Sequence, residues 1–130
     1  MSMFKKLFAK EEGPKEPEFE IPWKLLQSMD QLDEIERLSG SKPVVIFKHS
    51  TRCGISSMVL RQFKKSYGYT QDQIQPYFLD LIANRAISNE VAIRFQTIHQ
   101  SPQMLVIRNG QTVLSASHYD VQAAHLERFI

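Results

Sequence analysis

The chain has 130 residues, of which 42% are hydrophobic and 23% charged, and its formal net charge is +2. These values predict one globular domain and exclude the one-sided basic surface of a nucleic-acid binder. The single cysteine, Cys53, excludes an intramolecular disulfide and a zinc site built on several thiolates, and it favours a reducing compartment. No apolar run approaches the roughly 20 residues that span a bilayer, and the start lacks a secretory signal. We therefore expect a cytoplasmic protein without a membrane span.

The first twenty residues differ in composition from the rest. Residues 1–10 are basic with three apolar side chains, whereas residues 11–20 combine five glutamates with two prolines. Such a segment buries little apolar area. The composition predicts a flexible N-terminal tail over 1–20 and one folded domain over 21–130. Contact of the tail with a membrane surface or a partner is the alternative.

Hydrophobic periodicity predicts three amphipathic helices in the folded part. The first begins at a capping box formed by Ser28 and Gln31 and ends at Gly40. The second directly follows Cys53. The apolar residues at helical spacing are Leu32, Ile35 and Leu38 in the first helix, Ile55, Val59 and Phe63 in the second, and Ile87, Val91, Phe95 and Ile98 in the third.

Strand-like runs alternate with these helices. Asn109-Gly110 is a strong type I′ hairpin signal between the last two runs, and Asp120 can cap a final helix that carries Leu126 and Phe129. The order β-α-β-α-β-α-β-β-α predicts an α/β fold, a central mixed sheet with helices on both faces. The predicted strands occupy residues 23–26, 43–48, 75–81, 104–108 and 112–117.

Cys53 lies between a buried strand and a helix, which is where α/β folds place ligands. The unpaired N–H groups and positive dipole end of the helix favour a thiolate over a thiol. Arg52 is adjacent, and Lys48 and His49 end the preceding strand, so we expect basic groups near the sulfur. The hydroxyl of Ser56, three residues on, is expected to donate a hydrogen bond to it. A buried structural cysteine is the alternative.

Other cysteine chemistries do not fit the spacing. A cysteine phosphatase loop has an arginine six residues after the cysteine, where this chain has Val59. A dithiol redox site needs C-x-x-C, and Ser56 holds the second position. A cysteine protease needs a positioned histidine. Three histidines lie beyond residue 95, but nothing in the sequence brings any of them to Cys53.

Ser101-Pro102-Gln103 stands directly before the strand at 104–108. Proline is permitted sterically at the first residue of a strand. If the Ser101–Pro102 bond is cis, the backbone of Ser101 becomes available for strand-like pairing with a substrate.

The run Phe-Lys-His-Ser-Thr-Arg-Cys-Gly-Ile-Ser over 47–56, with Ser101-Pro102-Gln103 and Asn109-Gly110, resembles the monothiol bacilliredoxin family of thioredoxin-fold proteins. The resemblance covers residues 22–130. It implies a thioredoxin-like fold in which a cis-proline faces the active cysteine. It also implies a monothiol thiol–disulfide oxidoreductase that removes a low-molecular-weight thiol, bacillithiol, from protein mixed disulfides.

The resemblance also implies roles for individual residues. Cys53 matches the nucleophile, Ser56 the serine of the C-x-x-S site, and Ser101 and Pro102 the cis-proline pair. The expected substrate-binding residues are Thr51, Arg52, Gly54, Ser101 and Pro102. No metal and no tightly bound cofactor is expected. The small thiol is a co-substrate, and the expected partners are thiolated client proteins. Either a second small thiol or a partner reductase resets the cysteine.

Three other functions stay open at this point. The family has proline after the cysteine, whereas Gly54 gives the Cys-Gly-x-Ser of monothiol glutaredoxins. This favours, as the main alternative, an iron–sulfur cluster module in which two chains and two small thiols supply four thiolates. An arsenate-type reductase would need arginines such as Arg94 and Arg108 at the site. A thioredoxin-fold protein with only an interaction role is the last.

Overall fold

The computed structural model describes residues 20–130, so the predicted tail lies almost entirely outside the described residues. Strands and helices follow one another in the predicted order, and none of the helices in this part is long and apolar enough to cross a membrane. The elements are β2 (Lys24–Leu25), α2 (Asp30–Leu38), β3 (Val44–His49), α3 (Gly54–Ser66), β4 (Gln75–Asp80), α4 (Arg85–Arg94), β5 (Gln103–Arg108) and β6 (Gln111–Ser117), then the 3₁₀ helices η1 (His118–Asp120) and η2 (Ala123–Phe129).

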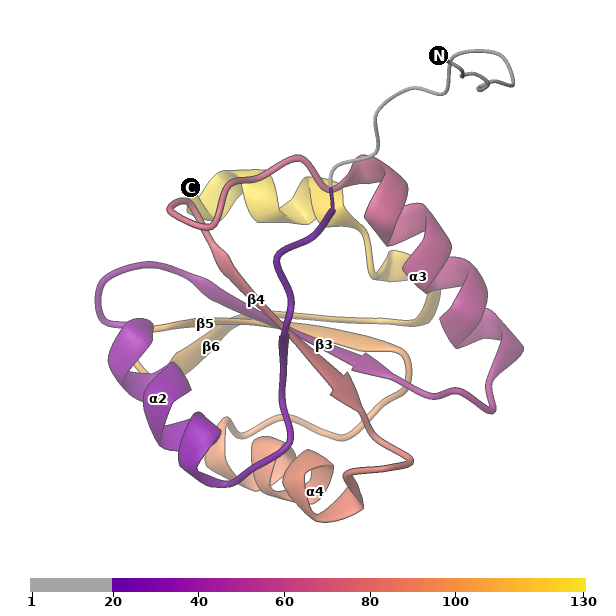
Figure 1. Ribbon diagram of the computed structural model, residues 1–130, viewed down its shortest axis with the longest axis horizontal. Coiled ribbons are helices and arrows are strands. Elements are labelled where there is room, and N and C mark those ends of the chain that lie inside the picture. Colours follow the sequence, from indigo (N-terminus) through magenta and orange to yellow (C-terminus); the bar gives the residue numbers. More distant parts are fainter. Residues whose placement is uncertain (1–19) are drawn as a thin grey trace, which may run out of the picture.

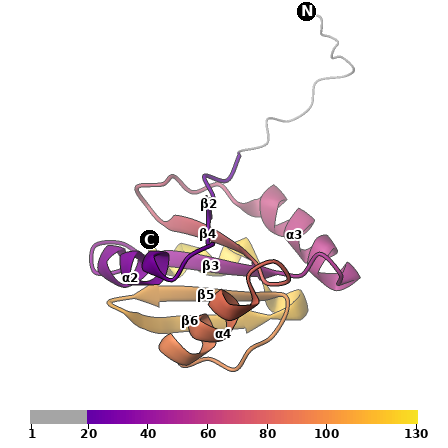
Figure 2. The ribbon, with the colours of Figure 1, turned by 60° about the horizontal axis from the view of Figure 1, so that its bottom comes forward.

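The five strands form one mixed sheet in the order β2-β4-β3-β5-β6, which is visible from top to bottom in Figure 2. β2, β4 and β3 are parallel, whereas β5 is antiparallel to both β3 and β6. Helices α2 and α4 cover one face, and α3 and η2 cover the other (Figure 1). The predicted α/β architecture is therefore confirmed, with β3 at its centre.

The central strand β3 is buried along its whole length because helices cover both of its faces. Its side chains alternate between the two cores, since successive residues of a strand point to opposite faces. Val45 and Phe47 pack in the core under α3, and Val44 and Ile46 pack in the core under α2 and α4. This alternation continues to Lys48 and His49, and it decides what each of them contacts.

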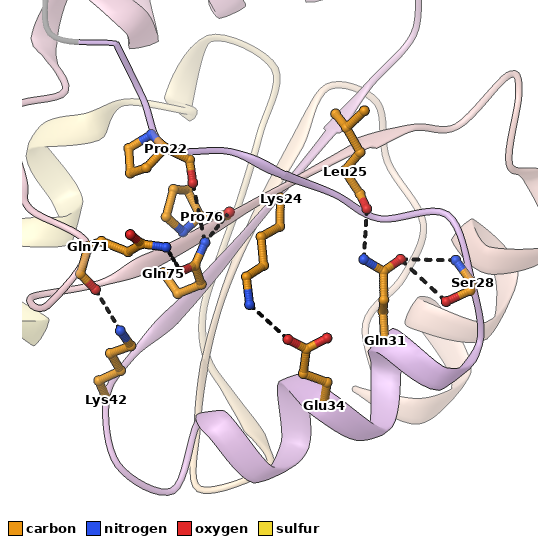
Figure 3. Close-up of polar contacts among 10 residues, drawn as sticks. All are labelled: Pro22, Lys24, Leu25, Ser28, Gln31, Glu34, Lys42, Gln71, Gln75 and Pro76. Carbon is orange, nitrogen blue, oxygen red and sulfur yellow. Dashed lines mark hydrogen bonds and ion pairs between the residues drawn. The ribbon is translucent and has the colours of Figure 1, made fainter.

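Three local predictions differ from the structure. Helix α2 begins at Asp30, and only one half of the capping box forms: Gln31 Oε1 accepts the N–H of Ser28 at 3.1 Å (Figure 3). Ile98 does not continue the stripe of α4, because that helix ends at Arg94 and Ile98 is 82% exposed. The C-terminal segment is 3₁₀ rather than α, and Asp120 does not cap it, since extended residues 121–122 separate them.

Two connections behave as their residues predict. Asn109 and Gly110 both have positive φ, 54° and 75°, as a type I′ hairpin between β5 and β6 requires. At the other edge of the sheet, the Gln31 side chain donates to the carbonyl of Leu25 at 2.8 Å, and Lys24 pairs with Glu34 (Figure 3). These contacts hold the two-residue strand β2 against α2.

Candidate active site

Cys53 is the N-cap residue of α3 and is half-buried. Its N–H donates to the Ser50 carbonyl at 3.2 Å, and its carbonyl accepts the N–H of Ser57, which closes the first turn. The first N–H groups of a helix have no partner within it. No acidic residue lies in the first turn of α3. The positive end of the helix dipole can therefore act on a Cys53 thiolate without competition from a side-chain carboxylate.

The register of the sheet places the Ser101–Pro102 segment beside the end of β3 that leads to Cys53. Lys48, near the end of β3, pairs with Gln103 at the start of antiparallel β5. β3 leads into the loop to α3, and Pro102 immediately precedes β5 (Figure 1). The carbonyl of Pro102 accepts the N–H of His118 at 3.0 Å, and η1, which begins at His118, packs against α3.

The peptide bond between Ser101 and Pro102 is cis, as expected from the sequence. Pro102 is buried, whereas Ser101 is partly exposed. Within residues 20–130, neither the N–H nor the C=O of Ser101 takes part in a hydrogen bond, and its buried hydroxyl also has no partner. The backbone of Ser101 is therefore free to pair with an extended peptide.

The expected hydrogen bond from Ser56 to Cys53 is wrong. The Ser56 hydroxyl is fully buried, accepts the N–H of Ser50 at 3.1 Å and lies 2.8 Å from His49 Nδ1. Among the hydrogen bonds of the described residues, none joins Ser56 to the sulfur. The reason is its position in the first turn, where the side chain points inward to the end of β3. Ser56 fixes the loop that carries Cys53 and makes no hydrogen bond to the thiol among the described residues.

The expected basic groups are also distributed differently. Alternation along β3 sends Lys48 to the α4 face and only His49 to the α3 face, where Cys53 begins its helix. His49 is 7% exposed and lies against Phe78, and burial lowers its pKa although Asp80 opposes the effect. The neutral form of His49 is therefore favoured. Arg52 is the remaining cation next to the cysteine, and it is exposed.

The other predicted substrate-binding residues surround the cysteine. Thr51, Arg52 and Gly54 are all exposed beside it. A Cβ built on Gly54 would meet nothing within 4 Å, so the space above the start of α3 is open to a ligand.

The arginines of the arsenate-reductase alternative lie elsewhere. Arg94 pairs with Asp33 and Glu36 of α2 at 2.6 and 3.0 Å. Arg108 ends β5, opposite to the Pro102 end, and donates to the Ser39 carbonyl. Residues 20–130 also contain no group of three or more His, Cys, Asp or Glu side chains that could hold a metal ion.

Two histidines of the site have contacts that sequence reasoning missed. His49 pairs with Ser56, and His118, whose φ is 56°, donates its N–H to the carbonyl of Pro102. The period of two along β3 was a signal for His49, since it places that residue on the face of Phe47. No local signal existed for His118, because its contact joins the end of one strand to the start of its neighbour.

Replacing Ser56 with alanine should destabilise the protein by about 1–3 kcal/mol, because the buried N–H of Ser50 and the imidazole of His49 each lose a partner. Urea unfolding measures this change. Ser57→Ala is the matched control: it removes a hydroxyl from the next position of α3, and that hydroxyl makes no hydrogen bond within the described residues. Equal stabilities of the two variants would contradict the assignment of Ser56.

The fold and the site together define the class of this protein: a thioredoxin-fold protein with a lone cysteine at a helix N-terminus. Solved structures support this. A proposed oxidoreductase with a thioredoxin fold matches with a TM-score of 0.69 at 30% identity, covering 82% of this chain and 91% of that chain. Thioredoxin from Malassezia sympodialis (Mala s 13) matches with a TM-score of 0.65 at 24% identity over 89% and 93% of the two chains. Thioredoxin from Trypanosoma brucei brucei gives 0.64 at 17% identity over 83% and 87%.

The family follows from a second comparison. Residues 24–126 match the model of the monothiol bacilliredoxin BrxC family. The chain therefore belongs to this family, as the resemblance of the segment around Cys53 indicated. Family and fold both support a redox function carried by a thiol.

Proposed function

We propose that this protein is a monothiol thiol–disulfide oxidoreductase that removes a low-molecular-weight thiol, bacillithiol or a similar compound, from mixed disulfides on cytoplasmic client proteins. The observation that carries the proposal is the position of Cys53 at the N-cap of α3. Cys53 follows the end of β3, and the unpaired backbone of Ser101 lies just before the start of the neighbouring strand β5. Cys53 supplies the attacking thiolate, and the backbone of Ser101 supplies a pairing site for the disulfide-bearing segment of the client.

The reaction has two exchange steps. The Cys53 thiolate attacks the small-thiol sulfur of the client disulfide, so a Cys53–small-thiol disulfide forms and the client leaves as a thiolate. A second small-thiol thiolate then attacks the small-thiol sulfur bound to Cys53. This step releases the free cysteine and a disulfide of two small thiols, and the number of disulfide bonds stays constant. A partner reductase is the alternative resetting agent, because the chain has no second cysteine.

Three sets of groups in the site have separate roles in this reaction. The N–H groups at the start of α3 stabilise the thiolate both as attacker and as leaving group. Ser56 and His49 hold the loop that carries the cysteine. Thr51, Arg52 and Gly54 form the exposed surface on which the small thiol lies.

The test is a single-turnover transfer followed by mass spectrometry. Reduced protein is mixed with a client thiolated by bacillithiol, and in parallel by glutathione or cysteine. The proposal expects the client to lose the mass of the small thiol while Cys53 gains it, with the fastest transfer for the preferred thiol. A client that keeps its adduct with all three thiols contradicts the proposal. Visible absorption after anaerobic reconstitution with iron, sulfide and the thiol, without transfer, would instead favour the cluster-binding alternative.

A further inference from the structure

A lysine is buried on the side of the sheet that faces away from Cys53. Lys48 has no exposed surface, and no salt bridge among the described residues includes it. An ammonium without a carboxylate partner is costly to bury. The contacts that Lys48 makes must therefore offset this cost, and they are specific. Its Nζ donates to the Ser88 carbonyl of α4 at 3.3 Å and to His99 Nδ1 at 3.4 Å.

His99 belongs to the segment that leads to Ser101, whose backbone is the proposed pairing site for the substrate. Residues 97–101 form the main part of the connection between α4 and β5 and end at the Ser101–Pro102 bond. Few hydrogen bonds hold this segment within the described residues. The Thr97 N–H donates to the Ala92 carbonyl, and Gln103 Nε2 donates to the Ile98 carbonyl at 2.9 Å. The contact between Lys48 and His99 is the remaining one.

Lys48 and Gln103 are cross-strand partners at the ends of β3 and β5. Both side chains are almost completely buried, and they reach His99 and Ile98, two consecutive residues of the segment. The hydroxyls of Thr97 and Ser101 have no partners of their own in residues 20–130. The conformation of the segment therefore depends on two side chains that lie beneath it.

We propose that Lys48 is a positioning residue that acts through His99 to hold segment 97–101 in the conformation that presents the Ser101 backbone to the substrate. This inference rests on the proposed function, because it assigns substrate docking to Ser101. Lys48 itself contacts neither the substrate nor the sulfur. It acts on substrate affinity rather than on the thiolate.

The proposal implies a dependence on pH. Two cations face His99: Lys48 from β3 and Arg85 from α4. Burial lowers the pKa of His99, and repulsion by these two cations lowers it further. Nδ1 of neutral His99 accepts a hydrogen bond from the Lys48 ammonium, whereas protonated His99 is repelled by the ammonium. The contact between the Lys48 ammonium and neutral His99 is therefore present between the pKa of His99 and that of Lys48, which is about 8, and it is lost as the pH falls through the pKa of His99.

The variant Lys48→Met tests the proposal, because it removes the ammonium and keeps a long apolar side chain. KM for the thiolated client should rise about tenfold at pH 7.5, while kcat and the rate of Cys53 alkylation stay within twofold of wild type. The KM of wild type should rise at acidic pH, and that of Lys48→Met should stay flat. In an NMR titration, the pKa of His99 should rise in this variant, because the repulsion by Lys48 is lost.

Further variants separate this role from a general effect on folding. Lys42→Met is the matched control, because Lys42 stands near the opposite end of β3 and donates to the Gln71 carbonyl at 2.7 Å (Figure 3). His99→Asn keeps an acceptor and should retain most of the affinity, whereas His99→Phe should behave like Lys48→Met. The double variant Lys48→Met/His99→Phe should lose no more than either single variant.

An unchanged KM in Lys48→Met, or equal losses in Lys48→Met and Lys42→Met, would overturn the inference. If wild type shows no transfer activity, the proposed function fails, but the positioning effect is still measurable. The NMR order parameters of the backbone amides of residues 97–101 should fall in Lys48→Met and should not change in Lys42→Met. Unchanged order parameters in both variants would refute the role of Lys48 in holding the segment.

Discussion

Cys53→Ser should reduce transfer of the small thiol on the order of a thousandfold or more, the largest effect expected for any single substitution in this chain. A serine hydroxyl at neutral pH is not ionised and cannot form a disulfide, so both exchange steps are lost. Single-turnover transfer from a thiolated client, followed by mass spectrometry of both proteins, measures the loss.

The stability of the protein should depend on which residue replaces Cys53, because serine and alanine differ as N-cap residues. Cys53 is the N-cap of α3 and makes no side-chain capping hydrogen bond, whereas serine is among the best N-cap residues. Cys53→Ser should therefore be more stable than Cys53→Ala by about 0.5–2 kcal/mol, although both variants are inactive. Loss of activity together with a lower melting temperature in both would point to damage of the fold instead. Transfer at the wild-type rate by either variant would exclude Cys53 as the nucleophile.

The free energy of unfolding should rise by about 2 kcal/mol between pH 7 and pH 9.5 because of Lys48. Burial lowers its pKa to about 8, whereas an unfolded lysine titrates near 10.4. Between these values the unfolded chain binds a proton that the folded protein has released, so stability increases with pH. The penalty of the buried ammonium is present in full below pH 8 and is relieved as the pH rises through this window. Urea unfolding at a series of pH values measures it.

Lys48→Met is the reference for this titration, because it has no group to release. The difference in stability between the variant and wild type should be largest at pH 7 and should shrink towards pH 9.5. Burial also raises the pKa values of Tyr67 and Tyr77, which lowers stability above about pH 10, but both proteins share that effect. Parallel curves for the two proteins across pH 7–9.5 would show that the lysine is not buried as an ammonium.

The order of the elements was predictable because each rests on local patterns. The apolar run before Cys53 predicted a strand buried on both faces, and Asn109-Gly110 predicted a tight hairpin between two adjacent strands. The prediction for the third helix was wrong at its end, because the chain leaves the helix before the periodic pattern of apolar residues ends. The left-handed Gln96, with φ of 55°, follows the end of α4, so the periodic Ile98 stands on the surface.

The sequence alone determined that the chain has one cysteine, that this cysteine begins a helix, and that no second cysteine of the chain can resolve a disulfide on it. The tertiary structure decided what surrounds that thiol. Ser56 forms hydrogen bonds with His49 and Ser50 rather than with Cys53. Lys48 lies on the opposite face of the sheet. The backbone of Ser101 lies just before β5, whose start is paired with the end of β3 that leads to the cysteine. The physical reason is that spacing along the chain fixes which face a side chain takes. The sheet register then decides which distant residue lies against it.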